Sequence, residues 1–94
     1  MGAYWVYILK CSDGSLYTGC TNDLARRLGA HVAGKGSKYT RSRLPVTLSH
    51  VEEAPDRGNA LRREAQIKKL KRREKLLLCG IYDAKKKRGK RWQL

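Results

Sequence analysis

The chain has 94 residues, of which 22 are Lys or Arg and 8 are Asp or Glu, so its formal net charge is +14 and its pI is near 10.2. A chain of this length forms one small domain and leaves no room for separate catalytic and targeting domains. The positive charge favours a nucleic-acid partner. An anionic membrane would require an amphipathic helix with bulky apolar anchors, yet the chain contains no Phe. We therefore expect nucleic acid, and no membrane, as the partner.

The cysteines Cys11, Cys20 and Cys79 are widely spaced, form no C-x-x-C pair and have no histidine cluster of zinc-site spacing nearby. This pattern is typical of reduced thiols in a cytosolic protein. The apolar run at the N-terminus covers only residues 3–9 and no basic segment precedes it. Neither a signal peptide nor a membrane span is supported, so we expect a soluble, cytoplasmic protein.

The first half of the chain predicts a hairpin followed by a helix. Residues 4–10, YWVYILK, are aromatic and β-branched, and an Asp-Gly turn signal separates them from the LYTG of residues 16–19. This pattern predicts two antiparallel strands. Residues 21–34 begin with candidate helix caps, place Leu24, Leu28 and Val32 at helical spacing and end at Gly34. They predict a short amphipathic helix.

The second half predicts a basic loop over residues 35–45, a third strand over residues 46–53 and a helical pattern over residues 60–79 that ends at Gly80. The helical pattern has a candidate break near Arg72 or Arg73. The element order is ββαβα plus one further helix, which indicates an α+β fold rather than a parallel βαβ array. We expect one domain over residues 1–84 and a basic C-terminal tail over residues 85–94.

Two residues on the first predicted helix suggest chemistry. Arg27 and His31 are one turn apart and lie along one flank of the apolar arc, where they can line the edge of a cleft. The apolar arc consists of Leu24, Ala25, Leu28 and Val32. The alternative is that Arg27 is a solvated charge and His31 a boundary histidine bonded to a backbone carbonyl. From this helix alone, the alternative is favoured.

A carboxylate falls inside the apolar arc of the long predicted helix. Glu64 lies among the residues that define its buried side, namely Ala60, Leu61, Ala65, Ile67 and Leu70. Because burying an unpaired charge is costly, Glu64 must be ion-paired or must bind a cation. A pair with Lys68 at i+4 is the favoured interpretation for an isolated glutamate. The alternative is a magnesium site, since Mg²⁺ is held by one or two carboxylates together with waters and phosphate.

Tyr7 and Tyr17 belong to the two strands of the predicted hairpin, and tyrosines in strands are usually core residues with a hydrogen-bonded hydroxyl. None of these signals is specific alone. Together they would place phenols, a guanidinium, an imidazole and a carboxylate around one cleft of a basic domain. Phosphodiester hydrolysis needs this set of groups: a positioned nucleophile, charge neutralisation and a metal acting as Lewis acid.

These residues carry a resemblance to a known family. The chain contains WVY at residues 5–7 and YTG at residues 17–19, with ten positions from Tyr7 to Tyr17. NDLARRLGAH follows with Arg27 and His31, and ALRREAQIKKL contains Glu64. In these motifs, over residues 3–80, the chain resembles the GIY-YIG nuclease family in its short single-domain bacterial form. Several members, including the nuclease half of the excision protein UvrC, have a lysine where this chain has Cys20, and the asparagine that many members carry after the glutamate helix has no counterpart in REKLLLCG.

The resemblance implies a small three-stranded antiparallel sheet flanked by helices, with the active site across the face that bears both tyrosines. It also implies a DNA endonuclease that depends on Mg²⁺ or Mn²⁺, with branched or damaged DNA in repair or recombination as candidate substrates. Arg27 would hold the scissile phosphate, Glu64 would bind the metal, Tyr7 or Tyr17 (Tyr7 more than Tyr17) would help to activate water, and His31 would orient or assist.

The basic segments of the chain serve either a nuclease or a binding protein. Lysine and arginine contact phosphates without reading sequence, and the candidates before the third strand are Lys35, Lys38, Arg41 and Arg43. A non-catalytic protein that binds DNA or RNA is therefore the alternative function, and a basic ribosome-associated protein is a weaker one. A monomer is favoured, and a protein partner is a candidate source of specificity.

Overall fold

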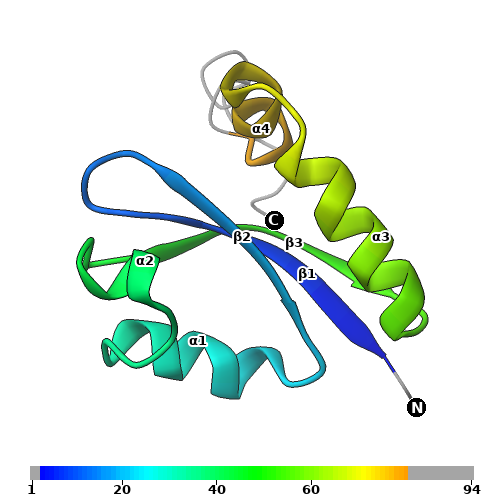
Figure 1. Cartoon of the computed structure of the whole chain (residues 1–94), viewed down its shortest axis with the longest axis horizontal. Coiled ribbons are helices and arrows are strands. Elements are labelled where there is room, and N and C mark those ends of the chain that lie inside the picture. Colours follow the sequence, from blue (N-terminus) through cyan, green and yellow to red (C-terminus); the bar gives the residue numbers. More distant parts are fainter. Residues whose placement is uncertain (1–2, 81–94) are drawn as a thin grey trace.

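The computed structural model describes residues 3–80, and these form a three-stranded antiparallel sheet with helices on both faces (Figure 1). The predicted α+β class and sheet are confirmed. The predicted tail over residues 85–94 lies outside the described residues. The elements are β1 (Tyr4–Lys10), β2 (Leu16–Thr21), α1 (Leu24–Val32), α2 (Lys38–Arg41), β3 (Thr47–Ala54), α3 (Arg57–Lys68) and α4 (Arg72–Leu78).

The sheet has the order β2-β1-β3, so the predicted hairpin provides the centre and one edge. The Asp-Gly signal forms its turn, where Gly14 has a φ of +85° that favours glycine and the Cys11 amide donates to the Ser15 carbonyl at 2.9 Å. Tyr7 pairs with Gly19 of β2 and with Val51 of β3. The register of β3 shifts once, between the partners of Ile8 and Leu9.

Side chains alternate along β1 and create two small cores, one on each face of the sheet. α3 covers the face of Val6 and Ile8, and α1 lies on the opposite side of the sheet, over the face of Tyr7 and Leu9 (Figure 1). The buried members on the α3 side are Val6, Ile8, Ala54, Ala60 and Ile67. Those on the α1 side are Tyr7, Leu9, Cys11 and Val46.

The two longer helices begin at aspartate caps, and their buried stripes are narrower than the sequence predicts. Asp23 caps α1, and Asp56 accepts from the Asn59 amide at 2.8 Å, so α3 begins at residue 57 rather than 60. The prediction that Leu61 and Ala65 lie on the buried side of α3 is wrong, because both are exposed, and Ala25 and Val32 of the apolar arc of α1 are exposed as well. A small sheet contacts each helix along only part of the apolar arc.

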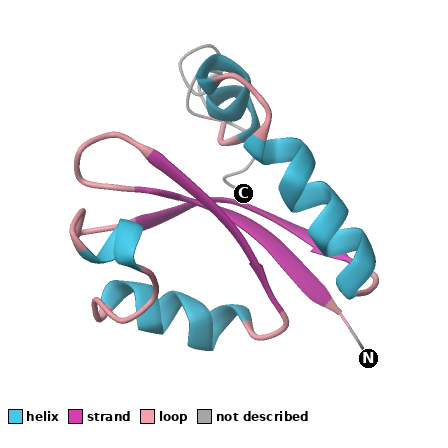
Figure 2. Cartoon of the chain, viewed as in Figure 1, coloured by secondary structure: helices cyan, strands magenta, loops and turns pink. Residues whose placement is uncertain are grey.

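The prediction of a basic loop over residues 35–45 is wrong at Lys38–Arg41, because α2 forms there (Figure 2). Ser37 begins the helix, and its hydroxyl accepts from the Thr40 amide at 3.2 Å. A single turn of helix has no apolar periodicity by which to detect it. The break in the long C-terminal helix is confirmed, and it lies between Lys68 and Arg72.

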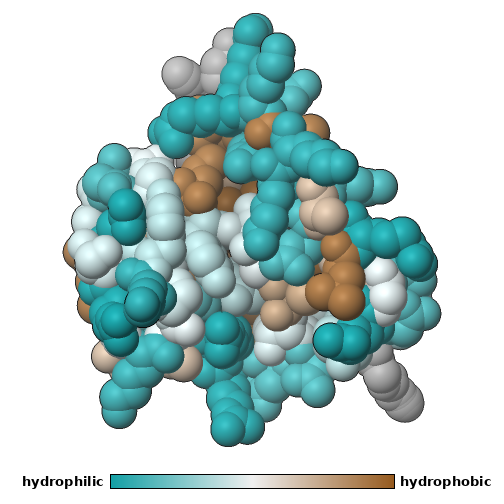
Figure 3. Space-filling model, in the orientation of Figure 1, coloured by the Kyte–Doolittle hydropathy of each residue, from teal (hydrophilic) through white to brown (hydrophobic). Residues whose placement is uncertain are grey.

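Hydrophilic residues cover most of the face shown in Figure 3, where hydrophobic residues form small separate patches. Within residues 3–80 no helix is long and apolar enough to cross a membrane. All three cysteines carry free thiols, and Cys11 is buried.

Candidate active site

Both tyrosines lie on the α1 face of the sheet. In the hairpin register Tyr7 is opposite Gly19 and Tyr17 is opposite Leu9, so the two tyrosines are diagonal neighbours on one face. The Tyr7 ring lies directly over Gly19 of the edge strand, since a Cβ at position 19 would be 2.6 Å from its hydroxyl oxygen. Glycine at that position therefore makes room for the phenol over β2.

A buried hydrogen-bond chain holds the Tyr7 hydroxyl. His31 Nε2 lies 3.1 Å from the Tyr7 hydroxyl and His31 Nδ1 lies 2.9 Å from Thr40 Oγ1. Tyr7, His31 and Thr40 are all 1% exposed or less. The Thr40 hydroxyl lies 3.4 Å from the Ser37 carbonyl, to which it can donate, and 3.0 Å from Ser37 Oγ. In the tautomer that has its proton on Nδ1, His31 donates to Thr40 and its Nε2 accepts from the Tyr7 hydroxyl.

The His31 ring fits because Gly36 lies against it. A Cβ at position 36 would be 2.6 Å from both Cε1 and Cγ of that ring. Burial, and then the charge of Arg27, lower the pKa of His31 below its usual value, so the imidazole is neutral at pH 7. His31 is thus a core residue bonded to two side chains, rather than a boundary residue bonded to a backbone carbonyl.

Arg27 lies beside both phenols at the rim of this buried set. The Tyr7 phenol first and Tyr17 second raise the pKa of Arg27. Burial raises the pKa of Tyr7, against the opposing effect of the guanidinium. Arg27 Nη2 donates to the Gly36 carbonyl at 3.4 Å, and Arg27 also borders a hollow of about 320 Å³ along the flank of α1. A guanidinium so placed can bind a phosphate that approaches the tyrosines.

Glu64 lies across the sheet from this group. It projects from α3, where Oε1 accepts from the Cys20 thiol at 3.4 Å and Oε2 pairs with Lys68 at 3.2 Å. Burial and the neighbouring carboxylate raise the pKa of Cys20, so the thiol keeps its proton and donates it. The i+4 partner expected from the sequence is therefore present. Within residues 3–80 no three His, Cys, Asp or Glu side chains gather as a metal-binding group.

The four predicted phosphate contacts are not equivalent. Lys35, Lys38 and Arg41 are exposed around α2, whereas Arg43 is half-buried and pairs with Asp13 of the hairpin turn at 3.1 Å. Sequence reasoning also missed Thr40, the buried partner of His31. Its only sequence signal was the serine three residues earlier, a spacing typical of a helix cap.

The structure thus brings Tyr7, Tyr17, Arg27 and His31 together and leaves Glu64 on the other face of the same edge strand. The model of the GIY-YIG catalytic domain matches residues 3–76. The chain therefore belongs to the GIY-YIG family, which is a nuclease family.

Its relatives are UPF0213 proteins, the short single-domain members of that family. One from Halobacterium salinarum is 53% identical over 70 residues, which cover 74% of this chain and 91% of that protein. One from Streptococcus sanguinis is 56% identical over 72 residues, 77% of this chain and 83% of that protein. The solution structure of a UPF0213 protein from Bacillus halodurans matches this fold with a TM-score of 0.55 over 84% of each chain, and the two sequences are 46% identical. The solution structure of a protein from E. faecalis matches with a TM-score of 0.59 over 88% of each chain, at 38% sequence identity.

Proposed function

We propose that this protein is a divalent-metal-dependent endonuclease that hydrolyses DNA phosphodiester bonds. The observation that carries the proposal is the position of Arg27 beside two phenols, one of which is hydrogen-bonded to a buried neutral histidine. Positive charge at the phosphate and a proton acceptor for the attacking water are the two protein contributions that this reaction requires. Branched or damaged DNA in bacterial repair or recombination is the proposed setting, within the cytoplasm.

Arg27 binds the scissile phosphate and stabilises the negative charge that develops on it. Tyr7 accepts a proton from the attacking water as its own proton passes to His31 Nε2 along the hydrogen bond between them. Thr40 keeps the imidazole in the tautomer whose Nε2 can accept that proton. Tyr17 packs against the imidazole, with ring centroids 5.3 Å apart, and restricts its orientation.

Glu64 is the proposed ligand of the metal, which is Mg²⁺ or Mn²⁺. The carboxylate fits as a single ligand, since magnesium takes few protein groups and completes its shell with water and phosphate. It fits only if Lys68, whose side chain is 57% exposed, moves away from Oε2. A bound metal would supply Lewis-acid stabilisation of the leaving oxygen.

In this proposal the groups on the two faces of β2 serve one phosphate at its outer edge. The Tyr7 ring lies over Gly19 on one face, and the next residue, Cys20, projects from the other face to contact Glu64. Because β2 is an edge strand, its outer side is not paired with another strand among residues 3–80. In this proposal a phosphate at that edge meets Arg27, at the rim of the tyrosine group, on one face and Glu64 on the other.

The basic residues around α2 bind the flanking DNA in this proposal. Lys35, Lys38 and Arg41 would contact phosphates without sequence selection, and specificity would depend on DNA shape or on a protein partner. We propose that the protein acts as a monomer.

A second candidate function is non-catalytic DNA binding. One observation favours it: both oxygens of Glu64 already have partners, a thiol and an ammonium group. If the Glu64 carboxylate serves only these contacts with Cys20 and Lys68 and binds no metal, the protein would have the fold and basic surface of a nuclease but would not cleave DNA.

The test is to incubate the purified protein with plasmid, branched DNA and single strands, with and without Mg²⁺ or Mn²⁺, beside the Glu64→Gln and Arg27→Ala variants. The proposal expects metal-dependent cleavage that both variants lose. Glu64→Gln should retain DNA binding and change the free energy of unfolding by less than about 1 kcal/mol, because the pair with an exposed lysine is screened by water. Cleavage that persists in Glu64→Gln would reject the metal-ligand role, and no cleavage by the wild type on any substrate would favour the binding protein.

A further inference from the structure

Planar side chains continue outward from the candidate active site to the surface. The His31 and Tyr17 rings have centroids 5.3 Å apart, and Tyr17 stacks on Tyr39 with centroids 6.0 Å apart and planes inclined by 28°. The guanidinium carbon of Arg43 then lies 3.9 Å from the centre of the Tyr39 ring. This series begins in the core at His31 and ends at a partly exposed guanidinium, so it connects the site to solvent.

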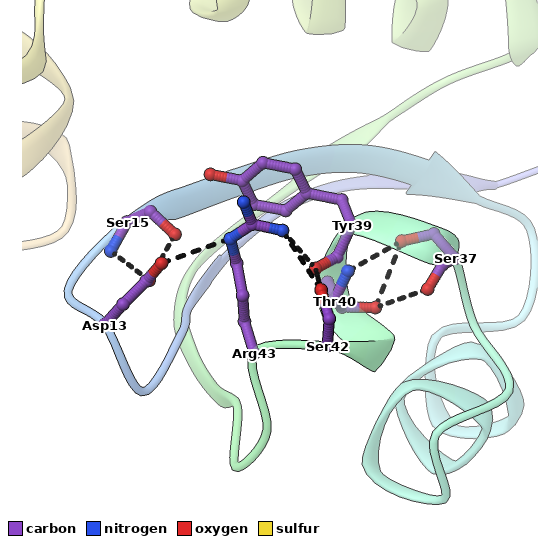
Figure 4. A network of polar contacts seen from close by, with 7 residues as sticks. All are labelled: Asp13, Ser15, Ser37, Tyr39, Thr40, Ser42 and Arg43. Carbon is purple, nitrogen blue, oxygen red and sulfur yellow. Dashed lines mark hydrogen bonds and ion pairs between the residues drawn. The ribbon is translucent and has the colours of Figure 1, made fainter.

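Arg43 is held as a fixed plane rather than as a mobile charge (Figure 4). Its Nε donates to Asp13 at 3.1 Å, and its Nη1 donates to the Tyr39 carbonyl at 2.9 Å and to Ser42 Oγ at 3.3 Å. Asp13 in turn accepts from the Ser15 amide and hydroxyl. These hydrogen bonds from Ser15, followed by that from Arg43, lower the pKa of Asp13, so the carboxylate stays ionised and compensates the guanidinium charge.

The platform formed by Tyr39 and Arg43 therefore has a chemistry different from that of the basic residues around it. The side chains of Lys35, Lys38 and Arg41 are exposed and positively charged, and such side chains bind phosphates. The Tyr39 residue is 38% exposed and the Arg43 side chain 34%, although both are tethered. A neutralised guanidinium plane that lies on an aromatic ring suits a nucleobase better than a phosphate, because bases stack on guanidinium and aromatic planes.

We propose that this platform stacks an unpaired base of single-stranded DNA whose backbone passes the candidate active site. The inference rests on the proposed function, since Arg27 is taken to hold the neighbouring phosphate. In a duplex both faces of each base are covered by its neighbours, so only a strand that is unpaired at this point can use the platform. The platform then selects the structure of the substrate and not its sequence, because every base has a stacking face.

The experiment measures DNA binding without divalent metal, so that no cleavage is needed. The probe is a short single-stranded oligonucleotide that carries a fluorescent base analogue, compared with its duplex. Tyr39→Leu removes the ring and Arg43→Lys keeps the charge but removes the plane. Tyr39→Phe, which keeps the ring, and Arg41→Ala, which removes an exposed charge from the same helix, are the matched controls. Thermal unfolding of each variant verifies that it is folded.

Tyr39→Leu and Arg43→Lys should each weaken single-strand binding by roughly 5- to 150-fold, the range that one stacked base accounts for, and should change duplex binding by less than about 2-fold. Tyr39→Phe should bind like the wild type, and Arg41→Ala should weaken both DNA forms alike. Equal losses on single strand and duplex would overturn the inference in favour of a phosphate contact. Unchanged binding in both platform variants would reduce the stack to a structural contact between α2 and the hairpin.

The inference and the proposed function can fail separately. If the platform variants lose single-strand binding but the wild type cleaves no DNA with metal, the nuclease proposal fails and the platform stands. If the wild type cleaves DNA and the platform variants bind and cleave single strands normally, the platform fails and the nuclease stands.

Discussion

Gly36→Ala should destabilise the protein, although the residue lies outside every helix and strand. The added Cβ would be 2.6 Å from two ring atoms of His31, which is completely buried and hydrogen-bonded at both nitrogens. Overpacking of this kind costs about 1–3 kcal/mol. If the ring instead moves away, Tyr7 and Thr40 lose a buried partner at a similar cost. We expect a loss of about 2 kcal/mol, which lowers the Tm of a domain of this size by roughly 8–16 °C.

The chain offers a matched control in Gly29→Ala. Gly29 is an exposed residue within α1, and a Cβ there meets nothing within 4 Å. Both substitutions reduce the conformational entropy of the unfolded chain by the same amount, so the difference in stability between the two variants reports on contacts in the folded protein. Alanine in a helix is favoured over glycine by about 1 kcal/mol, which should raise the Tm by roughly 4–8 °C. Thermal and urea unfolding of the two variants should therefore differ in sign. A Gly36→Ala protein as stable as the wild type would refute the tight contact on His31.

Three further outcomes follow from the same structure. Because the pKa of His31 is lower in the folded protein than the unfolded value of 6.5, the unfolded chain binds more protons as the pH falls through 6.5. The free energy of unfolding should therefore be highest above about pH 7 and fall as the pH drops through 6.5. Urea unfolding at several pH values should show a smaller pH dependence in His31→Gln. Arg63→Ala removes two hydrogen bonds of 2.7 and 2.9 Å to Glu52 and should lower the unfolding free energy by about 1 kcal/mol, whereas Arg62→Ala, at an exposed neighbouring position, should change it by less than about 0.5 kcal/mol. If about five side chains contact phosphates, the slope of log affinity against log salt for duplex DNA should be roughly −4 to −5, and a slope near zero would exclude electrostatic binding.

The elements with strong local signals were predictable from the sequence. The Asp-Gly turn signal between two runs rich in aromatic and β-branched residues predicts the hairpin, whose register in the structure places Tyr7 and Tyr17 on one face. The cap at Asp23 and the spacing of Arg27 and His31 fix their direction along α1. A turn, a strand or a helix cap depends on a few residues that are neighbours in the sequence, so the local sequence pattern is sufficient to predict it.

The features that the sequence did not predict depend on contacts between distant segments. Val32 is 64% exposed although the next residue before it, His31, is completely buried against Tyr7 and Tyr17, so the face of α1 that meets the sheet includes a polar residue that the apolar spacing does not reveal. The hydrogen bond between His31 and Thr40 joins two segments whose relative position follows from the turn at Gly34 to Ser37. Helical projection identified Glu64 as partly buried but did not reveal which face of the sheet it contacts.

The position of Glu64 bears directly on how a GIY-YIG site can be assembled in so small a domain. In a sheet of three strands, every residue of the central strand is next to an edge strand. The sheet is one layer of backbone that separates the groups on its two faces, so these groups can approach each other only around an edge strand. In β2 this happens at Gly19 and Cys20, because one residue lacks a side chain and admits the Tyr7 ring while the next one faces α3 and bonds Glu64. A larger residue at position 19 would push the phenol away from the edge, and a longer one at position 20 would displace the carboxylate. Positions 19 and 20 of β2 are therefore where the tyrosine group on one face and the Glu64 carboxylate on the other lie on either side of the same edge strand.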